Sequence, residues 1–243
     1  MRIISLSLLV GVAIAASTAP AQAASSLYRV ESGTTSLSVD SAALELLESL
    51  GLSFSGTFDT VTPADGFAVG FEILSPSDDD AVVGSTFNFN FDTATQAFAP
   101  VSGLIEHIGG LSFDVDTFDP TTNPDGLALF SPLEIGDFSI GFDGGFFIAD
   151  NVTTGLPLFD LVVNDAPSLD QRQLQVTGVD VLVSSNFNAL LSNAAGSTDL
   201  GLTGAKIGTA QIDANASKVP EPGTVVAIAL AGAAAIFGRR RAA

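Results

Sequence analysis

The chain has 243 residues, with 27 acidic and 8 basic side chains, 18 phenylalanines, one tyrosine and neither cysteine nor tryptophan. The net charge of −19 would repel nucleic acid, so the composition excludes nucleic-acid binding. Without cysteine, the chain has no disulfides, thiolate metal sites or cysteine nucleophiles.

The first 23 residues have the features of a secretory signal peptide. Arg2 supplies a positive charge, Ile3 to Ala16 form an apolar stretch, and Ala21-Gln22-Ala23 has the small-x-small pattern of a cleavage site. Cleavage after this tripeptide would leave residue 24 as the first residue of the exported protein.

Residues 24–215 are predicted to form one exported, β-rich domain. Phe87, Phe89 and Phe91 alternate with Asn88 and Asn90, a period of two that is typical of a strand with one buried face. Many such segments are separated by turn-forming residues, so we expect a mainly β fold: an antiparallel β-sandwich or jelly-roll-like domain with one or two short helices. Strands are expected at 27–31, 52–58, 67–74, 87–91, 111–116, 137–142, 145–149, 158–163, 173–177 and 179–183.

Two segments are predicted to be helical instead. The first begins at the capping residue Asp40 and ends at Gly51, and its buried face includes Leu44, Leu47 and Leu50. The second is expected over residues 184–193. After the last ordered segment, residues 216–218 are expected to be a linker to the C-terminal tail.

The tail, residues 219–243, combines three features in a fixed order. Val219-Pro220-Glu221-Pro222 forms a non-helical boundary, residues 224–237 are apolar and uncharged, and Arg239, Arg240 and Arg241 follow. The apolar residues predict a transmembrane helix of only about 20 Å, short of a hydrocarbon core of about 30 Å. Because positive residues favour the cytoplasmic side, the domain before the tail is expected outside.

This three-part tail resembles the PEP-CTERM sorting signal of Gram-negative bacteria, and the resemblance covers the tail only. It rests on Pro220-Glu221-Pro222, the apolar stretch and the three arginines. The resemblance implies processing near the Pro-Glu-Pro by an exosortase, a membrane-embedded cysteine peptidase. It also implies an exported protein that is tethered to the inner membrane before processing and lies at the cell surface or outside the cell afterwards. Unrelated proteins, some ice-binding proteins among them, share such tails, so the resemblance implies no activity.

One loop has the composition of a calcium site. Asp114, Asp116, Asp119 and Asp125 place several carboxylates close together in the sequence, and hard cations bind such oxygen ligands. Their spacing does not match an EF-hand, and a chain this acidic also produces such clusters by chance. Calcium is therefore the one cofactor that the sequence suggests, and no other is expected.

The sequence contains no catalytic constellation that we can identify. His107, the only histidine, is expected to be structural, because its neighbour Glu106 points to the opposite face of a strand. The expected role is a non-catalytic structural or interaction role in the extracellular matrix, with extracellular polysaccharide as a candidate partner. Two alternatives stay open: a calcium-dependent adhesive or glycan-binding module, and a secreted hydrolase that uses paired carboxylates.

Overall fold

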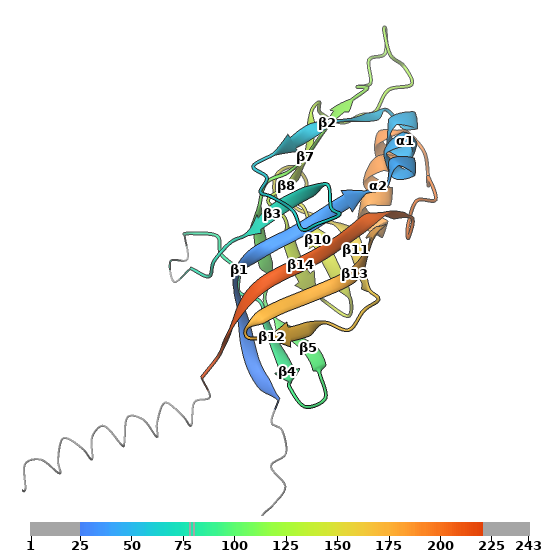
Figure 1. Ribbon diagram of the computed structural model, residues 1–243. Helices are drawn as coiled ribbons and strands as arrows, with labels where there is room; N and C mark the ends of the chain where they lie inside the picture. The colour runs from blue at the N-terminus through green and yellow to red at the C-terminus, as the bar shows by residue number, and fades with distance from the viewer. Residues whose placement is uncertain (1–24, 78, 80, 221–243) are drawn as a thin grey trace, which may run out of the picture.

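The computed structural model describes residues 25–77, 79 and 81–220 (Figure 1). The predicted signal peptide, residues 1–23, and the predicted transmembrane helix, residues 224–237, lie outside these residues. Within the described part of the chain, no helix is long and apolar enough to cross a membrane.

Strands dominate the described residues and form two antiparallel sheets, accompanied by two helices. The larger sheet contains β1 (Ser26–Val39), β3 (Val69–Ile73), β4 (Asn88–Asp92), β5 (Ala97–Ser102), β6 (Ile105–Ile108), β9 (Ser139–Phe142), β10 (Phe146–Ala149), β11 (Pro157–Val163), β12 (Ser168–Asp170), β13 (Gln173–Val183) and β14 (Lys206–Lys218). The smaller sheet contains β2 (Leu52–Phe58), β7 (Gly110–Val115) and β8 (Leu133–Gly136). The helices are α1 (Ser41–Ser49) and α2 (Ser185–Ala194).

The larger sheet closes on itself because the first strand pairs with the last. β1 and β14 pair from Tyr28 opposite Lys218 to Val39 opposite Gly208. Since β14 also pairs with β13, the order β13–β14–β1–β3–β6–β9–β10–β11 returns to β13 and forms a barrel-like ring. β4 and β5 extend the sheet beside the start of β1, and β12 extends it beside the start of β13.

This closed sheet corrects the expected β-sandwich or jelly-roll-like arrangement, whereas the mainly β class and the two short helices are confirmed. Alternation of apolar and polar residues predicts strands with one buried face. Such strands occur both in two sheets packed face to face and in one sheet that closes on itself, so the alternation does not distinguish these folds. Closure depends on the 14-residue β1, which pairs with β4 through residues 26–29 and with β3 through residues 33–37. The register against β14 shifts between Val30 and Ser32, where β1 changes partners.

The smaller sheet and both helices lie towards the end of the ring that is opposite the start of β1 (Figure 1). The chain passes from β6 into β7 through Gly109, which has a φ of 94° and where a Cβ would collide with the carbonyl oxygen of Asp59. Ser184 caps α2, since its hydroxyl oxygen accepts a hydrogen bond from the Phe187 N–H at 3.1 Å.

Phenylalanine side chains fill much of the interior. Phe71, Phe87, Phe89 and Phe91 are at most 1% exposed, and the ring of Phe71 packs edge-on against Phe138 with centroids 4.8 Å apart. A cavity of about 50 Å³ lies between the ring of strands, the smaller sheet and the helices. Its lining side chains are all aliphatic or aromatic, so this cavity supplies packing space and no polar chemistry.

Residues 216–218 are the end of β14, which corrects their expected role as a linker. Ala216 is 2% exposed, and its amide donates to the carbonyl of Arg172 at 2.8 Å. Lys218 pairs with Tyr28 of β1. Small side chains such as alanine give a weak apolar signal in a sequence, yet they are the inward-facing residues of this strand. The folded domain therefore extends up to the tail without a spacer.

Candidate functional site

The tail leaves the domain at the paired ends of β1 and β14. The Val219 N–H donates to the carbonyl of Leu27 at 2.9 Å, one residue beyond the last paired position of β14. The next residue, Pro220, has no N–H to donate, and β14 itself ends at Lys218. The start of the described domain and the start of the predicted tail are thus held side by side, and we call this place the tail junction (Tyr28, Lys218 and Val219).

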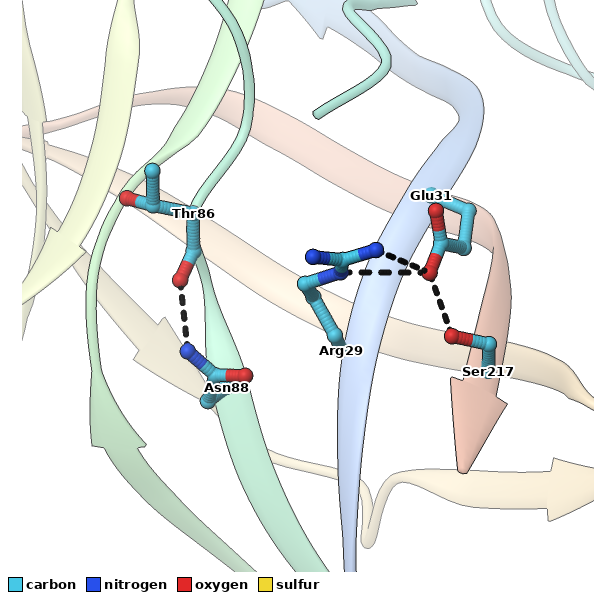
Figure 2. A network of polar contacts seen from close by, with 5 residues as sticks. All are labelled: Arg29, Glu31, Thr86, Asn88 and Ser217. Carbon is cyan, nitrogen blue, oxygen red and sulfur yellow. Dashed lines mark hydrogen bonds and ion pairs between the residues drawn. The ribbon is translucent and has the colours of Figure 1, made fainter. Parts of the chain in front are cut away.

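A polar network joins the two strands beside the tail junction (Figure 2). Nε and Nη2 of Arg29 each lie 3.2 Å from Oε1 of Glu31, and the Ser217 hydroxyl donates to the same oxygen. Asn88 at the start of β4 donates its side-chain N–H to the carbonyl of Thr86 at 2.8 Å. The Arg29 and Glu31 side chains are 43% and 31% exposed, so solvent screens the pair and its contribution to stability is about 1 kcal/mol or less.

Three of the four basic residues of the described domain lie at or near the tail junction. Arg29 is opposite Ser217 on β14, Lys218 is the last residue of β14, and Arg172 precedes β13, with its carbonyl bonded to the amide of Ala216. The fourth, Lys206, begins β14 at the opposite end and forms an ion pair of 2.6 Å with Asp180. The hydrogen bond to Asp180 raises the pKa of Lys206.

The outer face of β13, β14 and β1 carries rows of polar side chains that run across the strands. In one row Gln173 donates to Asn215 at 2.5 Å, and Asn215 donates to Ser32 at 3.2 Å. In the next row Gln175 and Gln211 donate to the two carboxylate oxygens of Asp213, at 2.9 and 2.7 Å. We call these six residues the polar rows. Sequence alternation placed Gln173 and Gln175 on a wet face, but their partners come from strands more than 35 residues away, so the rows themselves were not predicted.

The predicted calcium residues do not form a cluster. Among the described residues, no three histidine or carboxylate side chains lie close enough together to hold a metal ion. Asp116 accepts the side-chain N–H of Asn123 at 2.6 Å, and one oxygen of Asp119 accepts the amides of Thr121 and Thr122. These amide bonds lower the pKa of Asp119. Asp114 and Asp125 have no side-chain hydrogen bond in the described structure, and calcium binding at this loop stays a prediction that a melting temperature unchanged in millimolar calcium would reject.

His107 is buried inside the ring, where it forms two hydrogen bonds. Nδ1 lies 2.9 Å from the Phe138 carbonyl oxygen, and Nε2 lies 2.7 Å from the hydroxyl oxygen of Thr35. A carbonyl only accepts, so Nδ1 carries the proton and Nε2 accepts from Thr35. Burial lowers the pKa of His107 to about 4, against the opposing effect of the bond to Phe138. The pair has the spacing of a nucleophile and its base, but Thr35 and His107 are 3% and 2% exposed, so it contributes to packing in this structure.

Glu106 points to the other face of β6, as predicted, and is also buried. Ser139 donates its hydroxyl to Oε2 of Glu106 at 2.6 Å, and Asn151 donates to the Ser139 oxygen at 2.8 Å. Burial raises the pKa of the Glu106 carboxyl, and the bond from Ser139 partly opposes this rise. The side chain is satisfied by neighbours within the protein, as is typical of a structural carboxylate.

The fold and the tail junction together define a class: a β-rich, barrel-like domain that leads directly into a C-terminal sorting tail. Residues 218–241 match the family model of the PEP-CTERM protein-sorting motif, which confirms the resemblance seen in the tail. The motif implies export, a membrane-anchored tail before processing, and recognition by an exosortase-type enzyme. Of its predicted residues, Pro220 ends the described chain, whereas Glu221, Pro222 and Arg239 to Arg241 lie outside the described residues.

Two further comparisons concern the whole chain. No curated protein matches the sequence. Among solved structures, the heme-binding protein HtaB from Corynebacterium glutamicum is similar with a TM-score of 0.46 and 12% identity, over 79% of this chain and 97% of that chain. A similarity of this size carries no argument about function.

Proposed function

We propose that this chain is an exported cell-surface or extracellular-matrix protein with a non-catalytic structural or interaction role. In this proposal an exosortase-type peptidase separates the domain from its tail. The observation that carries the proposal is the match of residues 218–241 to a sorting motif that begins where the pairing of β14 ends. The described domain closes its sheet with residues up to 218, so it does not need the tail for its fold.

The mass of the exported protein tests this proposal. In a host that contains an exosortase, the mature protein is expected to lack residues 1–23 and Arg239 to Arg241. Replacing Pro220, Glu221 and Pro222 together by alanine is expected to leave the full tail in place. A mature wild-type protein that retains the three arginines would contradict processing.

The polar rows support polysaccharide as the partner. Their amide and hydroxyl groups are held in place by one another, which lowers the entropy lost when a hydroxyl-rich chain binds. Replacing Gln173 and Gln175 by alanine should weaken binding of the mature domain to purified exopolysaccharide at least tenfold, whereas Gln96→Ala on the β4–β5 turn should leave it unchanged. Equal binding by all variants would reject this face as the partner surface.

If binding required calcium, the adhesive-module alternative would gain support.

A further inference from the structure

The tail junction limits how far the domain can lie from the membrane that holds the tail. Between Val219, the last residue bonded to β1, and the start of the predicted membrane helix at residue 224, the chain can extend by about 18 Å. The end of the ring that contains the tail junction must therefore lie close to the membrane surface before processing. Figure 1 shows the start of β1, the end of β14, β12 and the β4–β5 hairpin at this end, and the loop after β7 at the other.

This end is also where the positive charge of the domain is concentrated. The exported residues before the tail contain 26 acidic and four basic side chains. Lys218 belongs to the tail junction, and Arg29 and Arg172 lie beside it. Arg29 is paired with Glu31, while Arg172 and Lys218 are exposed and form no ion pair among the described residues. Three acidic side chains also lie at this end: Glu31 on β1, Asp92 at the end of β4 beside the start of β1, and Asp170 on β12. They balance the three basic side chains here, whereas Lys206 is the only basic side chain among the other exported residues before the tail. An anionic surface would repel the rest of the domain, so this is the end that can approach one.

We propose that Arg172 and Lys218 dock the tail-junction end of the domain on anionic phospholipid headgroups while the tail holds the protein in the membrane. This inference rests on the proposed function of the tail. The two basic side chains together would shift the equilibrium between the undocked and docked states roughly thirtyfold towards the docked state. A contact of this strength matters only while the tail keeps the domain at a high effective concentration above the lipid. Removal of the tail would then release the domain, because its remaining net charge is strongly negative.

The chain has no cysteine, so single labels can report the orientation of the domain. The exported chain with its tail intact, residues 24–243, is placed in vesicles of phosphatidylcholine, with or without one third phosphatidylglycerol. A fluorophore at Ala94→Cys, on the β4–β5 turn, transfers energy to labelled lipid headgroups, and Phe130→Cys, in the loop between β7 and β8, serves as the distant label. We expect phosphatidylglycerol to increase transfer from residue 94 and not from residue 130. Salt on the order of 1 M, where the Debye length is about 3 Å, should abolish the increase.

Two lysines on the same strand provide a matched pair of variants. Lys218→Gln should reduce the effect of phosphatidylglycerol, and Arg172→Gln combined with Lys218→Gln should remove it. Lys206→Gln, at the opposite end of β14, should leave it unchanged. If Lys206→Gln is as damaging as Lys218→Gln, or if lipid composition has no effect on inserted wild-type protein, the proposed docking is wrong.

The same experiment separates this inference from the proposed function. If the protein washes off the vesicles in high salt, the tail does not insert and the proposed function fails together with the inference. If the protein stays inserted but ignores the lipid charge, only the inference fails. Binding of the tail-less domain to an anionic polysaccharide that depends on Arg172 and Lys218, without any lipid effect, would overturn the docking in favour of a polysaccharide site.

Discussion

Thr35 on β1 and His107 on β6 are joined by a hydrogen bond of 2.7 Å that spans the intervening strand β3. Because the His107 ring donates to the Phe138 carbonyl and accepts from Thr35, both of its nitrogens are used when it is neutral. Protonation of Nε2 would require the Thr35 hydroxyl to turn and accept, and it would place a charge in the buried interior of the ring. Burial therefore favours the uncharged form of this histidine, which makes the stability of the domain sensitive to acid.

We predict that the free energy of unfolding decreases as the pH falls from 6.5 towards 4. The ordinary pKa of histidine is 6.5 and burial lowers that of His107 to about 4, so between these values the unfolded chain binds the proton and the folded protein does not. The loss amounts to about 3 kcal/mol by pH 4. Urea unfolding at several pH values measures it, and His107→Asn should be less stable at pH 7 but lose this slope.

The raised pKa of Glu106 opposes this slope, because the folded protein takes up that proton at a pH where the unfolded chain does not, so the slope is measured in the Glu106→Gln protein. Backbone hydrogen bonds lower the pKa values of Asp92 and Asp119, so the stability that these carboxylates add is present above their ordinary pKa of 3.8 and is lost below it. In the Glu106→Gln protein, a free energy of unfolding that stays constant between pH 6.5 and 4.5 would therefore contradict the role given to His107.

Glu106→Gln is predicted to stabilise the domain at pH 7. Burial raises the pKa of Glu106, so its charged form is disfavoured in the folded state, and the penalty disappears as the pH falls below the ordinary pKa of a glutamate. Glutamine keeps an oxygen that can accept from Ser139. Ser139→Ala removes that donor and should lower the free energy of unfolding by about 1–3 kcal/mol. Chemical unfolding at pH 7 measures the free energy of unfolding of both variants. A Glu106→Gln protein less stable than the wild type would show that the folded state needs the charge of Glu106.

Phe71→Ala is predicted to destabilise the domain by about 3–5 kcal/mol, because it leaves a cavity beside Phe138 in the interior of the ring. Phe130→Ala is the matched control, since this side chain is 87% exposed and its loss should change the free energy of unfolding by about 0.5 kcal/mol or less. Thermal or urea unfolding compares the two. Similar losses for both would mean that the loop between β7 and β8 packs against something in solution.

The sequence predicted most strands of the fold because one face of each is apolar. It missed β5, β6, β8, β12 and β14. In β6, Ile105, Glu106 and His107 are all buried and no alternation is visible. The burial of Glu106 depends on Ser139 and that of His107 on Thr35, partners from distant parts of the chain. Closure of the ring was equally hidden, since it depends on which strands pair and not on the pattern within any one strand.

The site was predictable in part for the same reason. The order of Pro220-Glu221-Pro222, the apolar stretch and the arginines is local in the sequence, and the sorting motif was found from it. The junction with the domain was not, because Ala214 and Ala216 are small residues whose burial comes from their neighbours on β1 and β13. The polar rows and the basic side chains at the tail junction were hidden for the same reason, since they come together only when β1, β13 and β14 pair.

Two truncations test whether the domain ends at Val219. A protein of residues 24–219 should keep the full stability of the domain, because it retains the Val219 N–H bond to Leu27 and the burial of Ala216. Ending the chain at Asn215 removes that bond and the bond from the Ala216 amide to Arg172, together worth about 2 kcal/mol. Thermal unfolding of the two proteins measures the difference. Equal melting temperatures would mean that residues 216–219 behave as the linker that the sequence suggested, and that the tail can extend further from the domain than the tail junction allows.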